Sequence, residues 1–165
     1  MGLYIKLGQP NMGDNQMKLS SQMEDYLETI YQLCREEGVA RVKAIAERLE
    51  VTNPSVVGAI KNLKQRKLVW QERYGYVRLT EQGQEIAGAV THRHEVLSSF
   101  FEKFLGLDPE TASGDACRIE HAVSAETVRR LRSVGEFLES EPQVNREWQE
   151  RFAQFCSQNE GRLLR

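Results

Sequence analysis

The stretch from Val42 to Thr80 constrains the fold more strongly than any other part of this sequence. Apolar residues at helical spacing predict two short helices in its first half, joined by a turn at residues 51–53. Pro54 suits the first position of the second helix. We expect that helix to bury the residues on one of its faces, namely Val56, Val57, Ile60 and Leu63. Its opposite face is polar, and such a pair of helices is typical of a helix-turn-helix.

Two β-rich runs follow directly, at residues 68–72 and 76–79, with Gly75 near the tip between them. Short extended runs around a turn that contains glycine predict a β-hairpin. A helix-turn-helix followed by a basic hairpin is the winged-helix arrangement, whose second helix enters the major groove of DNA. The sequence therefore predicts a DNA-binding module in this part of the chain.

The distribution of charge supports this interpretation, although the overall composition does not. The 165-residue chain has a net charge of -2, yet the stretch from Ala40 to Thr80 holds nine basic and three acidic residues. A basic segment inside an acidic chain indicates a local surface for phosphate groups. The candidate phosphate contacts are Arg41, Lys61, Lys64, Arg73 and Arg78, and Asn62 lies on the polar face of the second helix.

The remainder of the chain is predicted to be helical. Four side chains suited to N-cap positions open helices there: Ser21, Thr80, Asp108 and Ser124. Glu24 follows Ser21 at the spacing of a capping box, and Gly38 marks the end of that helix. The fold class that we predict is mainly α, with an N-terminal winged helix-turn-helix followed by an all-helical domain.

The helix after Thr80 carries a denser apolar stripe than a small winged domain needs. The stripe consists of Val96, Leu97, Phe100, Phe101, Phe104 and Leu105. A two-fold interface between copies of the chain is a natural use for such a surface, so we expect a homodimer. The domain boundaries that we predict are a flexible tail at 1–20, the winged helix-turn-helix at 21–86, and a dimerisation and metal-binding domain at 87–165.

The cysteines and the hydropathy pattern indicate a cytoplasmic protein. The three cysteines, Cys34, Cys117 and Cys156, are unevenly spaced and do not form a disulfide framework. No apolar run is long enough to span a bilayer, and the N-terminus has no signal-peptide pattern. We expect double-stranded operator DNA and a second copy as partners, with no membrane and no small-molecule substrate.

Cys117, Glu120 and His121 place a thiol, a carboxylate and an imidazole within about one helical turn. If the segment is helical, the three side chains share one face. Asp25 and Glu28 have the same relation on the first predicted helix, and His94 lies on the long one, with His92 as a weaker candidate. Packing of these three helices would gather carboxylates, imidazoles and a thiolate, a set that suits an intermediate divalent ion such as Fe²⁺ or Mn²⁺.

Each of these residues also has an ordinary interpretation. Acidic residues in the first turns of a helix are favoured by the helix dipole, and a cysteine is often a small buried apolar residue. A second alternative is a winged-helix regulator that senses oxidation through Cys117 without a metal, which requires an exposed thiol of low pKa. A thiol hydrolase would require an oxyanion loop that the segment lacks, so we expect no enzymatic activity.

Several segments together resemble the family of metal-dependent repressors that includes the diphtheria toxin repressor and the manganese transport regulator. The matching segments are residues 23–31, 45–49, 93–95 and 115–121, in the same order and at the same spacing. The resemblance covers residues 21–138. It implies a winged helix, a helical dimerisation domain and a metal site where the two domains meet, in a two-domain form without the SH3-like domain.

The resemblance also implies roles for individual residues. Asp25, Glu28, His94, Glu120 and His121 match the ligands of the manganese-type regulators, whereas Cys117 matches the iron type, which lacks the Asp25 and Glu28 pair. Thr52, Asn53, Pro54 and Ser55 match the start of the helix that enters the groove, but Gly58 replaces a glutamine that contacts bases in the iron type. The expected function is therefore a transcriptional repressor that Fe²⁺ or Mn²⁺ activates for operator binding, with a slight preference for iron.

Overall fold

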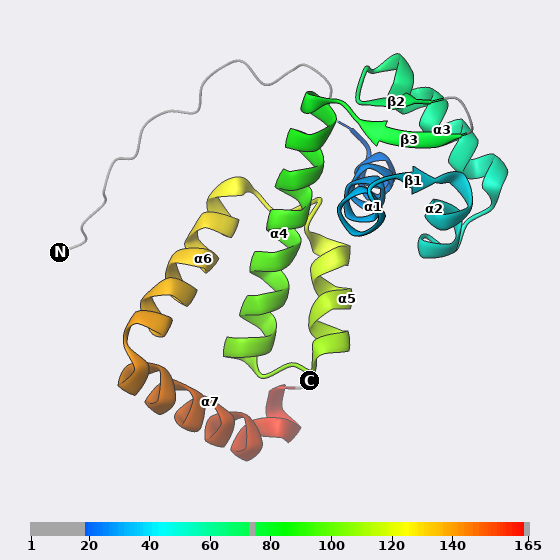
Figure 1. Cartoon of the computed structure of the whole chain (residues 1–165). Helices are drawn as coiled ribbons and strands as arrows, with labels where there is room; N and C mark the ends of the chain where they lie inside the picture. The colour runs from blue at the N-terminus through cyan, green and yellow to red at the C-terminus, as the bar shows by residue number, and fades with distance from the viewer. Residues whose placement is uncertain (1–18, 73–74, 164–165) are drawn as a thin grey trace.

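The computed structural model describes residues 19–72 and 75–163, and the elements run through it in the order shown in Figure 1. They are α1 (Ser21–Glu37), β1 (Ala40–Arg41), α2 (Val42–Arg48), α3 (Asn53–Gln65), β2 (Val69–Gln71), β3 (Tyr76–Leu79), α4 (Glu81–Leu105), α5 (Pro109–Ile119), α6 (Ala125–Ser140) and α7 (Pro142–Leu163). None of the described helices combines the length and the apolar character that crossing a bilayer requires.

The N-terminal part is the predicted winged helix. Strands β2 and β3 form an antiparallel hairpin in which Trp70 lies opposite Arg78, and β1 adds to the outer edge of β3. One hydrophobic core joins α1, α2, α3 and the sheet, and it includes Leu27, Ile30, Ile45, Val56, Leu63 and Val77. Because α1 contributes three fully buried residues to this core, Leu27, Ile30 and Leu33, the first helix is part of the DNA-binding module.

Most helix starts lie where the capping side chains predict. Thr80, Asp108 and Ser124 are the N-caps of α4, α5 and α6, and each side chain accepts a hydrogen bond from the backbone N–H three residues later. The prediction for α1 is wrong by one residue, because Ser20 is the N-cap and its hydroxyl accepts from the Met23 N–H. A capping box with Ser21 therefore does not form, and Glu24 is free for other contacts.

Val57 and the end of the N-terminal tail differ from the predictions. Val57 is 55% exposed, although we expected it to be buried, because Val56 occupies the centre of the buried face of α3. The predicted tail at 1–20 lies almost entirely outside the described residues. Its last two residues belong to the fold, since Leu19 is buried and Ser20 caps α1.

Helix α4 is the central element of the C-terminal part and packs against α1, α5 and α6 (Figure 1). Part of its apolar stripe is used inside the chain, because Leu97 and Phe104 are buried. Other large apolar side chains remain exposed on α6 and α7: Val134, Phe137, Val144, Trp148 and Phe155. Helix α4 is continuous across residues 86 and 87, where we place the domain boundary.

Candidate metal centre

The six predicted metal ligands come from three elements that pack together. Asp25 and Glu28 lie on α1, His94 on α4, and the remaining three at the end of α5. Figure 1 shows α1 and α5 on the same side of α4, and α4 contacts both helices. Residues up to 97 positions apart in the sequence, such as Glu24 and His121, are therefore in direct contact.

Glu120 lies at the centre of this cluster and is almost fully buried, with 1% of its surface exposed. Its Oε2 atom lies 2.8 Å from His94 Nδ1, and its Oε1 atom lies 3.4 Å from His121 Nε2. On the other side, His121 Nε2 lies 2.7 Å from Asp25 Oδ1. One ligand atom each from Asp25, Glu120 and His121 lies within 4.8 Å of the other two, which is close enough to hold one cation.

The polar atoms of this cluster are arranged for a cation. Glu120 Oε1 and His121 Nε2 are both buried. Glu120 Oε1 has no hydrogen-bond partner within the described part of the chain, and the polar atoms that His121 Nε2 faces are carboxylate oxygens, Asp25 Oδ1 at 2.7 Å and Glu120 Oε1 at 3.4 Å. Buried polar atoms without partners are rare and costly. A carboxylate oxygen and an imidazole nitrogen that face each other as acceptors repel unless a proton or a metal ion lies between them. The donor set therefore fits a divalent metal ion.

Glu28 and Cys117 lie beside the three-residue cluster. Glu28 is mostly buried, and burial, together with the charge of Glu120, raises the pKa of its carboxyl. Cys117 is exposed, yet partial desolvation raises the pKa of its thiol, and the charges of Glu120 and Asp25 act in the same direction. The charge of Glu120 therefore acts on both side chains, although neither belongs to the three-residue cluster.

The helical segment that we predicted for residues 115–121 ends earlier than expected. Helix α5 stops at Ile119, Glu120 is its C-cap in a right-handed conformation, and His121 lies in the turn that follows. The Glu120 N–H still donates to the Ala116 carbonyl oxygen. Glu120 therefore points into the protein as a helical residue would, while the turn brings His121 towards α1.

Several acid–base groups of the site have shifted pKa values. Burial raises the pKa of Asp25 despite the opposing charge of His121. The hydrogen bond to Glu120 raises the pKa of His94. Burial alone would lower the pKa of His121, but its hydrogen bond to Glu24 and the charges of Asp25 and Glu120 outweigh this and raise it.

These shifts predict how the stability of the metal-free protein depends on pH. Raised pKa values mean that the folded protein binds protons more tightly than the unfolded chain. The two histidines therefore contribute stability below their unfolded pKa of about 6.5, and this contribution is lost as the pH rises through the folded values. The raised carboxyl pKa values of Asp25 and Glu28 likewise make the folded protein more stable as the pH falls, in a lower pH range.

We expect the unfolding temperature of chelator-treated protein to rise as the pH falls from about 8 to about 6. With saturating metal the trend should reverse, because protons compete with the cation for the same atoms. Thermal unfolding at several pH values, with chelator and with metal, measures both trends. A metal-free protein that loses stability over this range would contradict the shifts.

Glu24 belongs to the site although it is not among the predicted ligands. Its Oε2 atom accepts hydrogen bonds from His121 Nδ1 at 2.8 Å and from Arg93 Nη2 at 3.1 Å. Sequence reasoning assigned Glu24 to the capping box with Ser21. The sequence did contain one indication of this role, because Glu24 directly precedes the predicted ligand Asp25. Two consecutive acidic residues of one helix can contact the two nitrogens of the same imidazole, as Glu24 and Asp25 do with His121.

The residues that we predict to contact DNA are exposed on the winged helix. Thr52 caps α3, and Asn53, Pro54 and Ser55 form its exposed first turn. Lys61, Asn62 and Lys64 are exposed further along the same helix, although Asn62 also accepts a hydrogen bond from Arg66.

Two arginines lie at the sheet, and a third lies outside the described residues. The Arg41 guanidinium lies over the ring of Tyr76, 5.3 Å from its centroid. Arg78 pairs with Glu72 at 3.4 Å, a contact between half-exposed groups that DNA phosphates can replace. Arg73, the remaining candidate, is outside the described residues.

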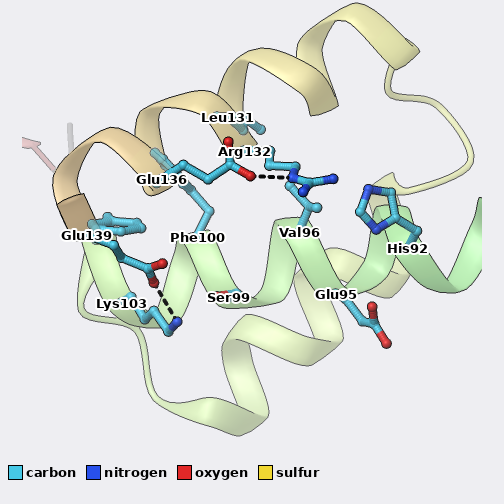
Figure 2. A pocket seen from close by; sticks show the side chains of 12 residues that line it. His92, Glu95, Val96, Ser99, Phe100, Lys103, Leu131, Arg132, Glu136 and Glu139 are labelled. Carbon is cyan, nitrogen blue, oxygen red and sulfur yellow. Dashed lines mark hydrogen bonds and ion pairs between the residues drawn. The ribbon is translucent and has the colours of Figure 1, made fainter.

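A separate groove lies between α4 and α6 and has a volume of about 330 Å³. Figure 2 shows His92 and Glu95 at one end of it and ion pairs of Arg132 with Glu136 and of Lys103 with Glu139 along it. None of the six predicted ligands lines this groove. His92, which was the weaker candidate, therefore faces α6 and not the carboxylate cluster.

Two family descriptions match consecutive parts of the chain. Residues 18–77 match the N-terminal DNA-binding domain of iron-dependent repressors, and residues 80–149 match their metal-binding and dimerisation domain. The HTH-type transcriptional regulator MntR of Bacillus velezensis is 34% identical over 125 residues, which cover 76% of this chain and 87% of that protein. The chain belongs to the iron-dependent repressor family.

Other relatives and solved structures support the same family assignment. MntR of Bacillus subtilis is 35% identical over 72% of this chain and 83% of its own length. Among solved structures, the manganese regulator SloR matches with a TM-score of 0.63 at 30% identity, covering 70% of this chain and 54% of that one. IdeR of T. acidophilum matches with a TM-score of 0.62 at 26% identity, and the repressor spans 53% of its length.

The family membership confirms the fold class and the general function. The protein is a metal-responsive, DNA-binding transcriptional repressor and not an enzyme. The relatives include proteins named for iron and for manganese, so they establish a divalent metal cofactor without choosing between the two ions.

Proposed function

We propose that the repressor controls metal-ion homeostasis genes in the cytoplasm as a homodimer, and that Fe²⁺ or Mn²⁺ raises its affinity for operator DNA. The ligands in this proposal are Asp25, Glu28, His94, Cys117, Glu120 and His121. The observation that carries it is the buried carboxylate of Glu120, which lies between His94 and His121 while Asp25 reaches His121 from α1.

The proposed mechanism couples the site to the position of the winged helix. Asp25 and Glu28 lie on α1, which is built into the core of residues 21–86, whereas His94 and Glu120 belong to residues 87–165. A bound divalent cation would supply the positive charge that these carboxylates lack. Without it the carboxylates of α1 would repel that of Glu120 at the end of α5, and the DNA-binding module would be held less firmly. Coupling free energies of this kind are typically about 1–3 kcal/mol.

The proposed DNA surface is the exposed start of α3 together with basic residues around it. Thr52, Asn53, Pro54 and Ser55 would enter the major groove. Arg41, Lys61, Lys64, Arg73 and Arg78 would contact phosphates, and Asn62 lies between the two groups. Phosphate contacts fix the position of the protein on the duplex, whereas contacts to base edges determine the sequence. A homodimer would place two such surfaces on successive major grooves.

Binding to the promoter DNA of a metal-uptake gene, with chelator and with Fe²⁺ or Mn²⁺ under anaerobic conditions, tests the function. We expect an increase in affinity of roughly 5- to 150-fold with metal, which corresponds to the coupling range above. Equal affinity in chelator and in excess metal would contradict the proposal.

Cys117 is the residue that we propose to favour iron. Thiolate is a softer ligand than carboxylate, and Fe²⁺ generally binds more strongly than Mn²⁺ at mixed sites. Asp25 and Glu28 act in the opposite direction, because carboxylates suit Mn²⁺. We therefore propose a slight preference for Fe²⁺.

Replacing Cys117 by glutamate is expected to shift the preference towards Mn²⁺. The ratio of the Fe²⁺ to the Mn²⁺ concentration needed for half-maximal DNA binding should rise about tenfold, because one soft ligand is exchanged for a hard one. Cys117→Ser should weaken activation by both ions. An unchanged ratio in Cys117→Glu would exclude the thiol from the site.

The same variants test the oxidation sensor that was the alternative. Such a sensor needs a thiol of low pKa, and desolvation and the neighbouring carboxylates raise the pKa of Cys117 instead. A response to peroxide without metal that disappears in Cys117→Ser would support the sensor. A weakened response to metal in the same variant supports the metal site.

A further inference from the structure

Glu24 is the point at which α1, α4 and the turn after α5 are joined by direct polar contacts. One oxygen, Oε2, accepts from both His121 Nδ1 and Arg93 Nη2. The three side chains are largely shielded from water, with exposures of 19% for Glu24, 9% for His121 and 24% for Arg93. Hydrogen bonds between charged groups in such surroundings are shorter and stronger than neutral ones.

The consequence for the imidazole of His121 is that both of its nitrogens face acidic residues of α1. Glu24 lies at Nδ1, and the next residue, Asp25, lies at Nε2 at 2.7 Å. A neutral imidazole carries one N–H, and the other nitrogen presents a lone pair. When Nδ1 donates to Glu24, the lone pair is on Nε2, which is the nitrogen that faces Asp25 and Glu120.

Arg93 holds Glu24 in this position. It precedes His94 on α4, and its guanidinium binds the same Glu24 oxygen that His121 uses. Because this oxygen already has two donors, Glu24 is turned away from the cluster formed by Asp25, Glu120 and His121. Asp25 therefore faces the metal cluster, whereas Glu24 contacts His121 and Arg93 outside it.

We propose that Glu24, held by Arg93, is a positioning residue for the metal site: it fixes the ring of His121 with the proton on Nδ1 and with Nε2 free to bind the ion. A partner of this kind raises the basicity of the ligand and orients the ring, and its loss typically costs about 10- to 100-fold in metal affinity. The proposal rests on the proposed function, since His121 is a ligand there.

The first test needs no metal. The chain has three histidines, so ¹⁵N NMR of chelator-treated protein can assign the proton of each ring, at a pH above the point where the same spectra show the His121 ring to be neutral. We expect the proton of His121 on Nδ1 in the wild-type protein and on Nε2, or exchanging between the two, in Glu24→Ala. A wild-type ring with its proton on Nε2 would overturn the proposal without any variant.

The second test measures Mn²⁺ affinity by competition with a chelator. Glu24→Ala should bind Mn²⁺ about 10- to 100-fold more weakly. Glu24→Gln should lose less, because its amide oxygen can still accept from Nδ1 although the charge that pairs with Arg93 is gone. Glu37→Ala, which changes an exposed acidic residue on the same helix, is the matched control and should not change the affinity.

The outcomes separate this proposal from the function on which it rests. Wild-type protein that binds neither Mn²⁺ nor Fe²⁺ contradicts the proposed function. In that case the positioning role in metal binding is overturned as well, and the NMR spectrum still shows which nitrogen of His121 carries the proton. Wild-type binding together with a Glu24→Ala affinity within twofold of it overturns the positioning role and leaves the function intact. If Glu24→Ala does not fold, Glu24→Gln and the wild-type spectrum decide.

Discussion

Replacing Glu120 by glutamine should abolish the metal response of the repressor while leaving its fold intact. Glu120 is the buried carboxylate whose two oxygens face two different histidines, 2.8 Å from His94 and 3.4 Å from His121. Glutamine keeps the shape of the side chain but loses its charge and one of the two acceptor oxygens. We expect metal affinity to fall by at least about 100-fold. Mutating a residue that only hydrogen-bonds to a ligand already lowers metal affinity by about 10- to 100-fold, and Glu120 is proposed as a ligand itself.

The measurement is metal-dependent DNA binding together with thermal unfolding in chelator. Glu110→Gln is the matched control, because Glu110 is an exposed acidic residue in the first turn of the same helix. The stability of the metal-free Glu120→Gln protein should stay within about 1 kcal/mol of wild type, because the amide can still form a hydrogen bond with His94. A variant that keeps the full response to Fe²⁺ or Mn²⁺ would remove Glu120 from the site.

Replacing Gly83 by alanine should have the largest effect on stability. A Cβ atom at this position would lie 2.0 Å from the carbonyl oxygen of Leu68 and 3.2 Å from Leu79 Cδ2. The Leu68 oxygen cannot move freely, because it accepts hydrogen bonds from the backbone N–H and the hydroxyl of Thr80. The wing and the first turn of α4 must therefore separate. We expect a loss of about 3 kcal/mol in the free energy of unfolding.

Gly88→Ala is the control, because Gly88 lies on the same helix and a Cβ atom there meets no other atom within 4 Å. Alanine in an open helical position should stabilise the protein by about 0.5–1 kcal/mol. Urea unfolding of the chelator-treated proteins gives both values. Equal effects of the two substitutions would show that the contact between Leu68 and α4 is not rigid.

The parts of the fold that depend on neighbouring residues were predictable from the sequence. The N-caps at Thr80, Asp108 and Ser124 and the hairpin around Gly75 follow from side chains that contact the backbone within a few residues. The start of α1 was wrong by one residue because Ser20 and Ser21 are chemically equivalent as caps. The sequence pattern alone does not distinguish them.

The site was predictable only in part. Spacing grouped Cys117, Glu120 and His121 and offered Asp25, Glu28 and His94 as further candidates. The family resemblance then matched these candidates to the ligands of known regulators. The contact of Glu24 with His121 was not predictable, since it spans 97 residues and depends on how α1 packs against the turn after α5. The exposure of Val57 has a similar origin, because two adjacent valines cannot both point to the centre of one helix face.

Helix α4 runs without a break from the wing past the metal centre. Its 25 residues span about 38 Å, and His94 lies near its middle, about 20 Å from the end that joins the wing. A tilt of about 5° around His94 would move that end by almost 2 Å, by the geometry of a rigid helix of this length. A small tilt of α4 at the metal site would therefore become a displacement of ångström size where the wing begins. The fit of a dimer to two half-sites depends on displacements of that size.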